Sequence, residues 1–152
     1  MARLLVIEDD ASTCYLLRIM LETEGHEVLI ADDGSRGLAA ATRRSPDAIV
    51  LDVMMPHLDG FAVLEALRED ERTVAIPVIV LSALQNESVE DRCYRLGAQS
   101  FIRKPFDAGI LLGTIQEVLD APPPLASERV AHEPREVPLA VSLAWRGFAG
   151  TG

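Results

Sequence analysis

The chain has 152 residues, of which 49% are hydrophobic and 25% charged, with a formal net charge of −10. This length predicts one domain with its own hydrophobic core, and the apolar content excludes a wholly disordered chain. No apolar run approaches the roughly 20 residues that a transmembrane helix needs, and the amino-terminal run turns acidic too early for a secretory signal. We therefore expect a cytoplasmic protein that does not enter a membrane.

The acidic charge is confined to one part of the chain. Residues 121–152 carry three acidic and three basic side chains, so residues 1–120 hold the whole net charge of −10. A domain this acidic, without a basic stripe, repels the phosphate backbone, and we expect no direct binding of nucleic acid. Thirteen of the 14 basic residues are arginines and only Lys104 is a lysine, which raises the question of what an arginine would fail to do at position 104.

Five short apolar runs alternate along the chain with stretches of helical periodicity. Four of these runs are continuous in aliphatic residues, as is typical of strands covered by helices on both faces. Five strand–helix units in succession predict an α/β fold with a doubly wound, five-stranded parallel sheet of the flavodoxin-like type, in the strand order 2-1-3-4-5. The predicted strands are 4–7, 28–31, 48–51, 78–81 and 100–102, and the predicted helices are 12–24, 34–44, 61–69, 87–96 and 107–119.

Helix caps are also predicted from the sequence. We expect Ser12 to cap the first helix, and the pair Asp32–Asp33 to cap the second, because short polar side chains accept hydrogen bonds from the free amides of a first turn. Two cysteines, Cys14 and Cys93, fall in helical patterns without a disulfide or metal-ligand spacing, and we expect both to be small buried side chains.

The strand–helix alternation stops at Asp120. Residues 121–152 begin with a proline-rich stretch and contain a second apolar segment, residues 137–148, with the only tryptophan, Trp145. This part is too short for a second domain. We expect a disordered tail, and a short segment docked on the domain or on a partner is the alternative.

Acidic, hydroxyl and basic side chains follow four of the five predicted strands. The carboxyl ends of parallel strands meet at one edge of the sheet, where ligands bind. Carboxylate oxygens suit Mg²⁺, an ammonium and a hydroxyl suit a phosphoryl group, and an aspartate can act as the nucleophile that accepts it. The residues concerned are Glu8, Asp9 and Asp10 after the first strand, Asp52 at the third, Ser82 at the fourth and Lys104 at the fifth.

These residues also stand in a specific pattern. E-D-D follows the first strand, D-x-x-M-P-x-x-D-G begins at Asp52, S-A follows the fourth strand and K-P the fifth. The combination resembles the receiver domain of bacterial two-component response regulators, the CheY-like superfamily, over residues 1–120. Members of this family often carry an output domain after the receiver; residues 121–152 are too short for one, and we expect none there.

The resemblance implies a role for each matching acidic residue. Asp52 is the implied phosphoacceptor, which becomes a 4-aspartylphosphate. Glu8, Asp9, Asp52 and the backbone carbonyl of Met54 are the implied ligands of Mg²⁺, with Mn²⁺ as an alternative. Asp10 falls one place beyond the acidic pair of the family, and we leave it out of the metal site.

Other matching residues are implied to contact the phosphoryl group or to report its presence. Ser82 and Lys104 correspond to the hydroxyl and the lysine that contact that group. Ser82 and Phe101 are the implied switch residues, which reshape the face formed by the fourth helix, fifth strand and fifth helix. Pro105 is expected to follow a cis peptide bond that aims Lys104 inward.

The implied function is signalling in a phosphorelay and not classical enzymatic turnover. Such a protein takes its phosphoryl group from a histidine kinase or a histidine phosphotransfer protein. It promotes its own Mg²⁺-dependent phosphorylation and dephosphorylation, and it signals by contact with an output protein. We expect a single-domain response regulator; a fragment of a larger regulator and a scaffold that acts without phosphorylation are the alternatives.

Two functions of other classes fit the sequence less well. A phosphohydrolase with an aspartate nucleophile typically carries that residue after the first strand, whereas Asp52 follows the third. A flavodoxin needs a phosphate-binding loop after the first strand, where the carboxylates of residues 8–10 repel phosphate.

Overall fold

Five strands and five helices alternate along the chain in the computed structural model, which describes residues 1–54, 59–83 and 86–121. Each predicted element is present, with boundaries that differ by at most one residue. The predicted tail lies outside the described residues, apart from Ala121. The elements are β1 (Arg3–Ile7), α1 (Ala11–Thr23), β2 (Glu27–Ala31), α2 (Gly34–Arg44), β3 (Ala48–Asp52), α3 (Gly60–Glu69), β4 (Val78–Ser82), α4 (Glu87–Arg95), β5 (Ser100–Arg103) and α5 (Ala108–Asp120).

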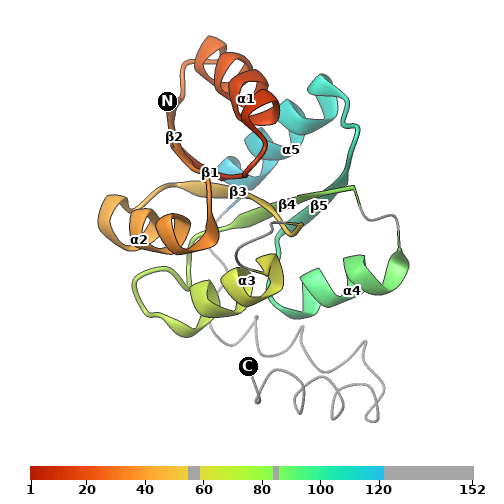
Figure 1. Cartoon of the computed structure of the whole chain (residues 1–152). Coiled ribbons are helices and arrows are strands. Elements are labelled where there is room, and N and C mark those ends of the chain that lie inside the picture. The colour runs from red at the N-terminus through yellow and green to blue at the C-terminus, as the bar shows by residue number, and fades with distance from the viewer. Residues whose placement is uncertain (55–58, 84–85, 122–152) are drawn as a thin grey trace.

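The strands form one parallel sheet in the order β2-β1-β3-β4-β5. This confirms the predicted fold class and strand order. Helices α1 and α5 cover one face of the sheet, and α2, α3 and α4 cover the other (Figure 1). The order reverses between β1 and β3, which places the carboxyl ends of these two strands at the switch point of the sheet.

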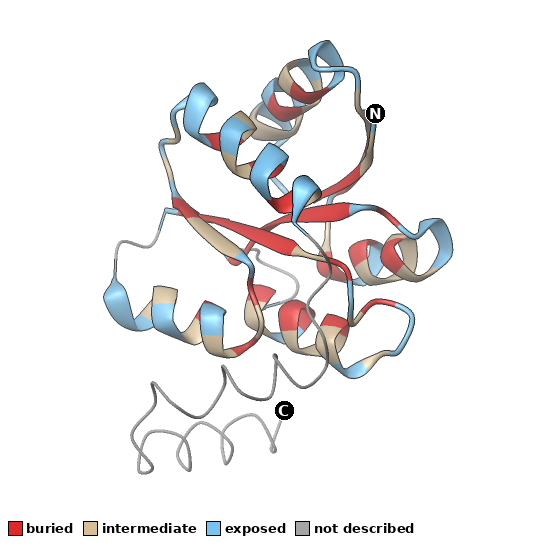
Figure 2. Ribbon diagram, turned by 180° about the vertical axis from the view of Figure 1, so that it is seen from behind, coloured by how far each residue is buried: buried red, intermediate tan, exposed pale blue. Residues whose placement is uncertain are grey.

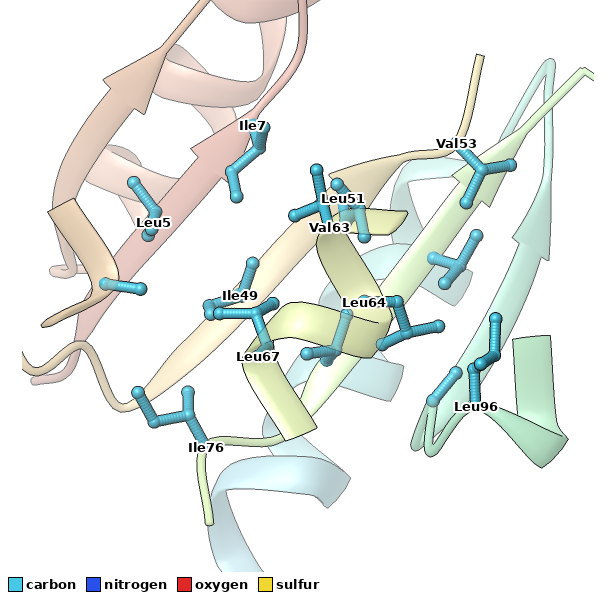
Figure 3. Close-up of a cluster of buried hydrophobic side chains, with 14 of the residues drawn as sticks. Leu5, Ile7, Ile49, Leu51, Val53, Val63, Leu64, Leu67, Ile76 and Leu96 are labelled. Carbon is cyan, nitrogen blue, oxygen red and sulfur yellow. The ribbon is translucent and has the colours of Figure 1, made fainter. Parts of the chain in front are cut away.

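Two hydrophobic layers hold the helices against the sheet. Because side chains of a strand alternate between faces, Leu5 and Ile7 of β1 pack under α2, α3 and α4, whereas Leu4 and Val6 pack under α1 and α5. Figure 3 shows the first of these layers, where Leu5, Ile7, Ile49 and Leu51 of the sheet face Val63, Leu64 and Leu67 of α3. Buried residues follow the strands and the inner sides of the helices (Figure 2).

The cap of α1 differs from the prediction. Asp10, and not Ser12, is the cap: its carboxylate accepts hydrogen bonds from the Thr13 amide at 2.9 Å and from the Thr13 hydroxyl at 2.6 Å. Ser12 lies inside the first turn, where its side chain is past the free amides that a cap must reach. Asp33 caps α2 as predicted, because its carboxylate accepts from the Arg36 amide at 2.7 Å.

Helices α3 and α4 are joined by two arginines. Arg68, near the end of α3, donates to the carbonyls of Val74, Ile76 and Gly97 at 2.8–3.1 Å. The guanidinium of Arg92 in α4 lies 4.0 Å from the ring centre of Phe61 in α3, a cation–π contact. The carboxyl-terminal end of α4 is therefore fastened to α3.

Within the described residues, no helix combines the length and the apolar character that crossing a lipid bilayer requires.

Candidate functional site

Three charged side chains meet at the carboxyl edge of the sheet because they share one face of it. Glu8, Asp52 and Lys104 each lie two positions beyond a residue of the layer under α1 and α5, namely Val6, Val50 and Ile102. The period of two along a strand therefore directs all three side chains to the same side. The polar residues buried among the described ones are Glu8, Asp52, Thr73 and Ser82, and three of these four belong to this edge.

Lys104 forms ion pairs with both carboxylates of the group. Its Nζ lies 2.6 Å from Oε1 of Glu8 and 3.3 Å from Oδ2 of Asp52, and these two carboxylate side chains are only 2% and 5% exposed. Burial lowers the pKa of Lys104, but the hydrogen bond to Glu8 and the charges of Asp52 and Glu8 outweigh it, so the pKa is raised. The ammonium therefore stays charged between two buried carboxylates.

The carboxylates of Glu8, Asp9 and Asp52 form an oxygen-only cluster. One carboxylate oxygen of each lies within 4.8 Å of the others. Burial raises the pKa of Glu8, and the neighbouring Asp52 carboxylate raises it further while Lys104 opposes the shift. Partial desolvation and the neighbouring Glu8 also raise the pKa of Asp9. One ammonium does not neutralise three carboxylates, so a divalent cation that prefers oxygen ligands, such as Mg²⁺ or Mn²⁺, fits this cluster.

The backbone that follows β3 orients Asp52. Its Oδ1 accepts a hydrogen bond from the amide of Met54 at 2.9 Å, which leaves Oδ2 on the side of Lys104. The start of α3 packs closely on this segment: a Cβ atom on Gly60 would lie 2.9 Å from the carbonyl oxygen of Asp52 and would also meet the backbone of Val53. Glycine at position 60 therefore lets α3 begin directly against the end of β3.

Ser82 and Phe101 belong to β4 and β5, the strands next to β3 at the same edge of the sheet. Ser82 follows Val80 by two positions, and Val80 and Phe101 both contact the hydrophobic layer under α2, α3 and α4. Ser82 is fully buried, and its carbonyl accepts a hydrogen bond from the Lys104 amide at 2.8 Å. Ser82 and Phe101 thus belong to the face of the sheet that α2, α3 and α4 cover. The backbone hydrogen bond between Lys104 and Ser82 connects this face to the charged group.

Two contacts of Glu8 were not predicted. The Asp10 amide donates to Oε2 of Glu8 at 3.2 Å, and the Cys14 thiol donates to the Glu8 carbonyl at 3.2 Å. The spacing of Asp10 and Thr13 is a capping pattern, and it was the available signal for the role of Asp10 outside the acidic cluster. Asp10 therefore orients Glu8 through its amide and caps α1 through its side chain.

The remaining predicted residues fall into three groups. The Lys104–Pro105 bond is cis, as expected. Cys93 is buried as expected, and burial raises the pKa of its thiol to about 12, whereas Cys14 is only half-buried. The side chain of Met54 is 52% exposed, and residues 55–58 and 84–85, which flank the site in sequence, lie outside the described part of the chain.

Comparison with known proteins gives one family. Residues 4–116 match the model of the response regulator receiver domain. The chain is 40% identical over 119 residues to protein PilH of Pseudomonas aeruginosa, covering 78% of this chain and 98% of PilH. It is 41% identical over 119 residues to the DNA-binding dual master transcriptional regulator RpaA of Synechocystis, where it covers 78% of this chain but only 49% of RpaA.

Solved structures give the same result. The chemotaxis protein CheY4 of Vibrio cholerae superimposes with a TM-score of 0.74 at 31% identity, covering 78% of this chain and 98% of CheY4. The receiver domain of the sensor histidine kinase PA1611 from Pseudomonas aeruginosa, solved with a magnesium ion in its active-site cleft, superimposes with a TM-score of 0.72 at 28% identity. That match covers 79% of this chain and 98% of the PA1611 domain.

Proposed function

This chain belongs to the response regulator receiver domain family, and from that premise we propose that Asp52 accepts a phosphoryl group from a histidine kinase or a histidine phosphotransfer protein. One observation carries the assignment. Asp52 is a buried carboxylate at the switch point of the sheet, and it lies 3.3 Å from the Nζ of the only lysine in the chain.

The reaction exchanges one bond to phosphorus for another. A carboxylate oxygen of Asp52 attacks phosphorus, and the bond from phosphorus to the donor's imidazole nitrogen breaks. The leaving imidazole keeps the electron pair of that bond, and the product is an acyl phosphate on Asp52. Such transfers depend mainly on positioning and on neutralising charge. Lys104, held between Glu8 and Asp52, supplies a positive charge beside the incoming phosphoryl oxygens.

Glu8, Asp9, Asp52 and the backbone carbonyl of Met54 are the proposed ligands of Mg²⁺, and Mn²⁺ offers the same coordination chemistry. The bound cation supplies charge neutralisation to the carboxylates and to the phosphoryl group. The oxygen-only donors of Glu8, Asp9 and Asp52 support this assignment, as does the magnesium ion in the cleft of the related PA1611 receiver domain.

Ser82 and Phe101 are the proposed switch. They share the sheet face that α4 covers, and the carbonyl of Ser82 is bonded to the amide of Lys104. A phosphoryl group that contacts the Ser82 hydroxyl favours one position of that residue, and Phe101 responds to the space beside it. The proposed readout is the face of α4, β5 and α5, where an output protein binds.

We further propose that the receiver signals through a separate output protein. The support is the likeness to PilH, of which the chain spans 98%. RpaA, of which the chain spans 49%, supports the alternative of a receiver within a longer regulator.

The decisive experiment offers acetyl phosphate with Mg²⁺ to the protein and records its intact mass. The wild type is expected to gain the mass of one phosphoryl group, and Asp52→Asn to gain none. Asp59→Asn is the matched control: Asp59 is an exposed acid that caps α3, and asparagine keeps that cap. A wild type that forms no adduct under varied conditions, or an adduct that survives in Asp52→Asn, contradicts the proposal.

A further inference from the structure

A hollow of about 520 Å³ lies on the face formed by α4, β5 and α5. These three elements are neighbours at one edge of the molecule (Figure 1). The hollow has an apolar part formed by Tyr94, Phe101, Phe106 and Ile110. Tyr94 and Ile110, two large side chains that line this hollow, are 46% and 59% exposed. The hollow is shallow and mixed in character, and these apolar side chains are the part of it that an apolar group can contact.

The rim of this hollow is acidic. Glu90, Asp107 and Glu117 line it together with a single base, Arg103. Nη2 of Arg103 lies 3.5 Å from Oε2 of Glu90, so the only cation in the lining already forms an ion pair. Helix α5 contains no lysine or arginine between Ala108 and Asp120. An apolar ligand that also carries a positive charge therefore fits this site better than a neutral or acidic one.

The chain itself contains a segment with this chemistry. Residues 137–148 are mostly apolar and include Trp145 and Phe148. No acidic residue occurs from position 137 to position 152, and Arg146, next to Trp145, is the only charged residue there. An aromatic side chain beside a single cation complements an apolar hollow with an acidic rim.

The chain between α5 and residues 137–148 is long enough for this segment to reach the hollow. Residues 122–136 number 15, and 15 residues extend to about 50 Å at most. From Asp120 back to Ile110, the path along α5 is ten residues, or about 15 Å. A segment tethered this closely has an effective concentration near the millimolar range, which favours binding within the chain even when the contact alone is weak.

We propose that residues 137–148 dock on the α4–β5–α5 hollow of their own chain, with Trp145 against Tyr94 and Ile110 and with Arg146 facing Glu117. Of the two alternatives for the tail, disorder and a docked segment, the hollow favours the second for these residues. Docking does not depend on the proposed phosphoryl transfer. Where the proposed function holds, the segment competes with the output protein for the same face.

The fluorescence of Trp145 tests this directly, since it is the only tryptophan in the chain. In the full-length protein, Trp145 is expected to emit at shorter wavelength than N-acetyltryptophanamide and to resist quenching by acrylamide. Ile110→Glu and Tyr94→Ala are each expected to raise the quenching constant several-fold. Both side chains are exposed, so neither change removes a core contact, and circular dichroism checks that the fold is kept.

Tyr15→Ala is the matched control. Tyr15 is 69% exposed and lies on α1 with the exposed Leu16 and Ile19, the other apolar stripe of the described surface. The control is expected to leave Trp145 shielded. If Tyr15→Ala instead exposes Trp145, or if wild-type Trp145 is quenched like the free amide, the proposal is wrong. Shielding that disappears on dilution assigns the contact to a second copy and also overturns it.

A charge exchange tests the placement of Arg146. Arg146→Glu is expected to increase quenching, and the double variant Arg146→Glu with Glu117→Arg is expected to reverse that increase. A double variant that is quenched as strongly as Arg146→Glu contradicts the pairing. Asp52→Asn is expected to give the wild-type fluorescence, so that a failure of docking and a failure of phosphoryl transfer are seen separately.

Discussion

Lys104 shows how one side chain can be chosen for its shape and not only for its charge. The ammonium reaches two carboxylates at once, at 2.6 Å and 3.3 Å, in a space where its own side chain is 20% exposed. A guanidinium is larger and planar, and it binds carboxylates through a fixed fork of donors. A compact point charge is therefore what the space between Glu8 and Asp52 accommodates.

Lys104→Arg is expected to slow formation of the phosphoryl adduct by about 10- to 100-fold. This corresponds to the loss of a charged hydrogen bond of about 1.5–3 kcal/mol in the transition state. The rate is measured by intact mass with acetyl phosphate and Mg²⁺. Arg103→Lys is the matched control, because it makes the reverse exchange one position away, at a side chain that is 51% exposed and pairs with Glu90. Equal rates for Lys104→Arg and the wild type would falsify this view of Lys104.

The sequence predicted most of these residues, because strand ends in a parallel sheet define which side chains meet. It did not predict how they are oriented. The bonds from Asp10 and Cys14 to Glu8 depend on the path of the backbone between β1 and α1. The cap of α1 was predicted at Ser12 and lies at Asp10. Both are good capping residues, and only the backbone decides which one precedes the first turn.

At the scale of elements, the junction between β3 and α3 carries a steric requirement. The start of α3 lies against the backbone of Asp52 and Val53, and only glycine at position 60 leaves room for this approach. The D-G pair of the sequence signature thus combines the cap of α3 from Asp59 with the close contact at Gly60. The position of Asp52 depends on how α3 begins.

Gly60→Ala is expected to lower the free energy of unfolding by about 1–3 kcal/mol, because the added methyl group meets backbone that cannot rotate away. It is also expected to slow adduct formation, since the backbone of Asp52 must shift. Urea denaturation measures the first effect and intact mass the second.

Gly113→Ala is the control for this substitution. Gly113 is within α5, and a Cβ atom there meets nothing within 4 Å. Alanine is expected to raise the free energy of unfolding by about 0.5–1 kcal/mol, because it favours the helix over the unfolded chain. A Gly60→Ala protein as stable as the wild type would show that the junction tolerates a side chain.

At the scale of the whole molecule, the net charge of −10 includes an acidic cluster that opposes folding. Glu8, Asp9 and Asp52 are brought within reach of one cation, and only Lys104 compensates them among the described residues. A ligand that binds only the folded state stabilises it by mass action. Binding of Mg²⁺ should therefore be visible in the stability of the entire domain.

MgCl₂ is expected to raise the melting temperature of the wild type above that in KCl of equal ionic strength. A concentration 100 times the Kd stabilises by about 2.7 kcal/mol, which corresponds to a shift of several degrees. Asp9→Asn is expected to lose most of this response. Asp10→Asn, which alters the adjacent acid but keeps a good cap, is expected to retain it. Equal responses in the two variants would contradict the metal site.

The overall fold was predictable because each strand–helix unit is local and the connections of a parallel sheet follow one handedness. Contacts between helices on the same face were not. No sequence pattern predicted that Arg68 bonds to three carbonyls or that Arg92 covers the ring of Phe61. Such contacts depend on how far apart α3 and α4 lie, which no periodicity encodes.

These two arginines hold the carboxyl-terminal end of α4 in place. Arg68 holds the carbonyl of Gly97, directly beyond the helix, and Arg92 is fastened to Phe61. The amino-terminal end begins at Asn86, whose side chain caps its own helix and bonds to Ser88. A rotation of α4 about its carboxyl-terminal end would displace the amino-terminal end most, and this end is close in sequence to Ser82.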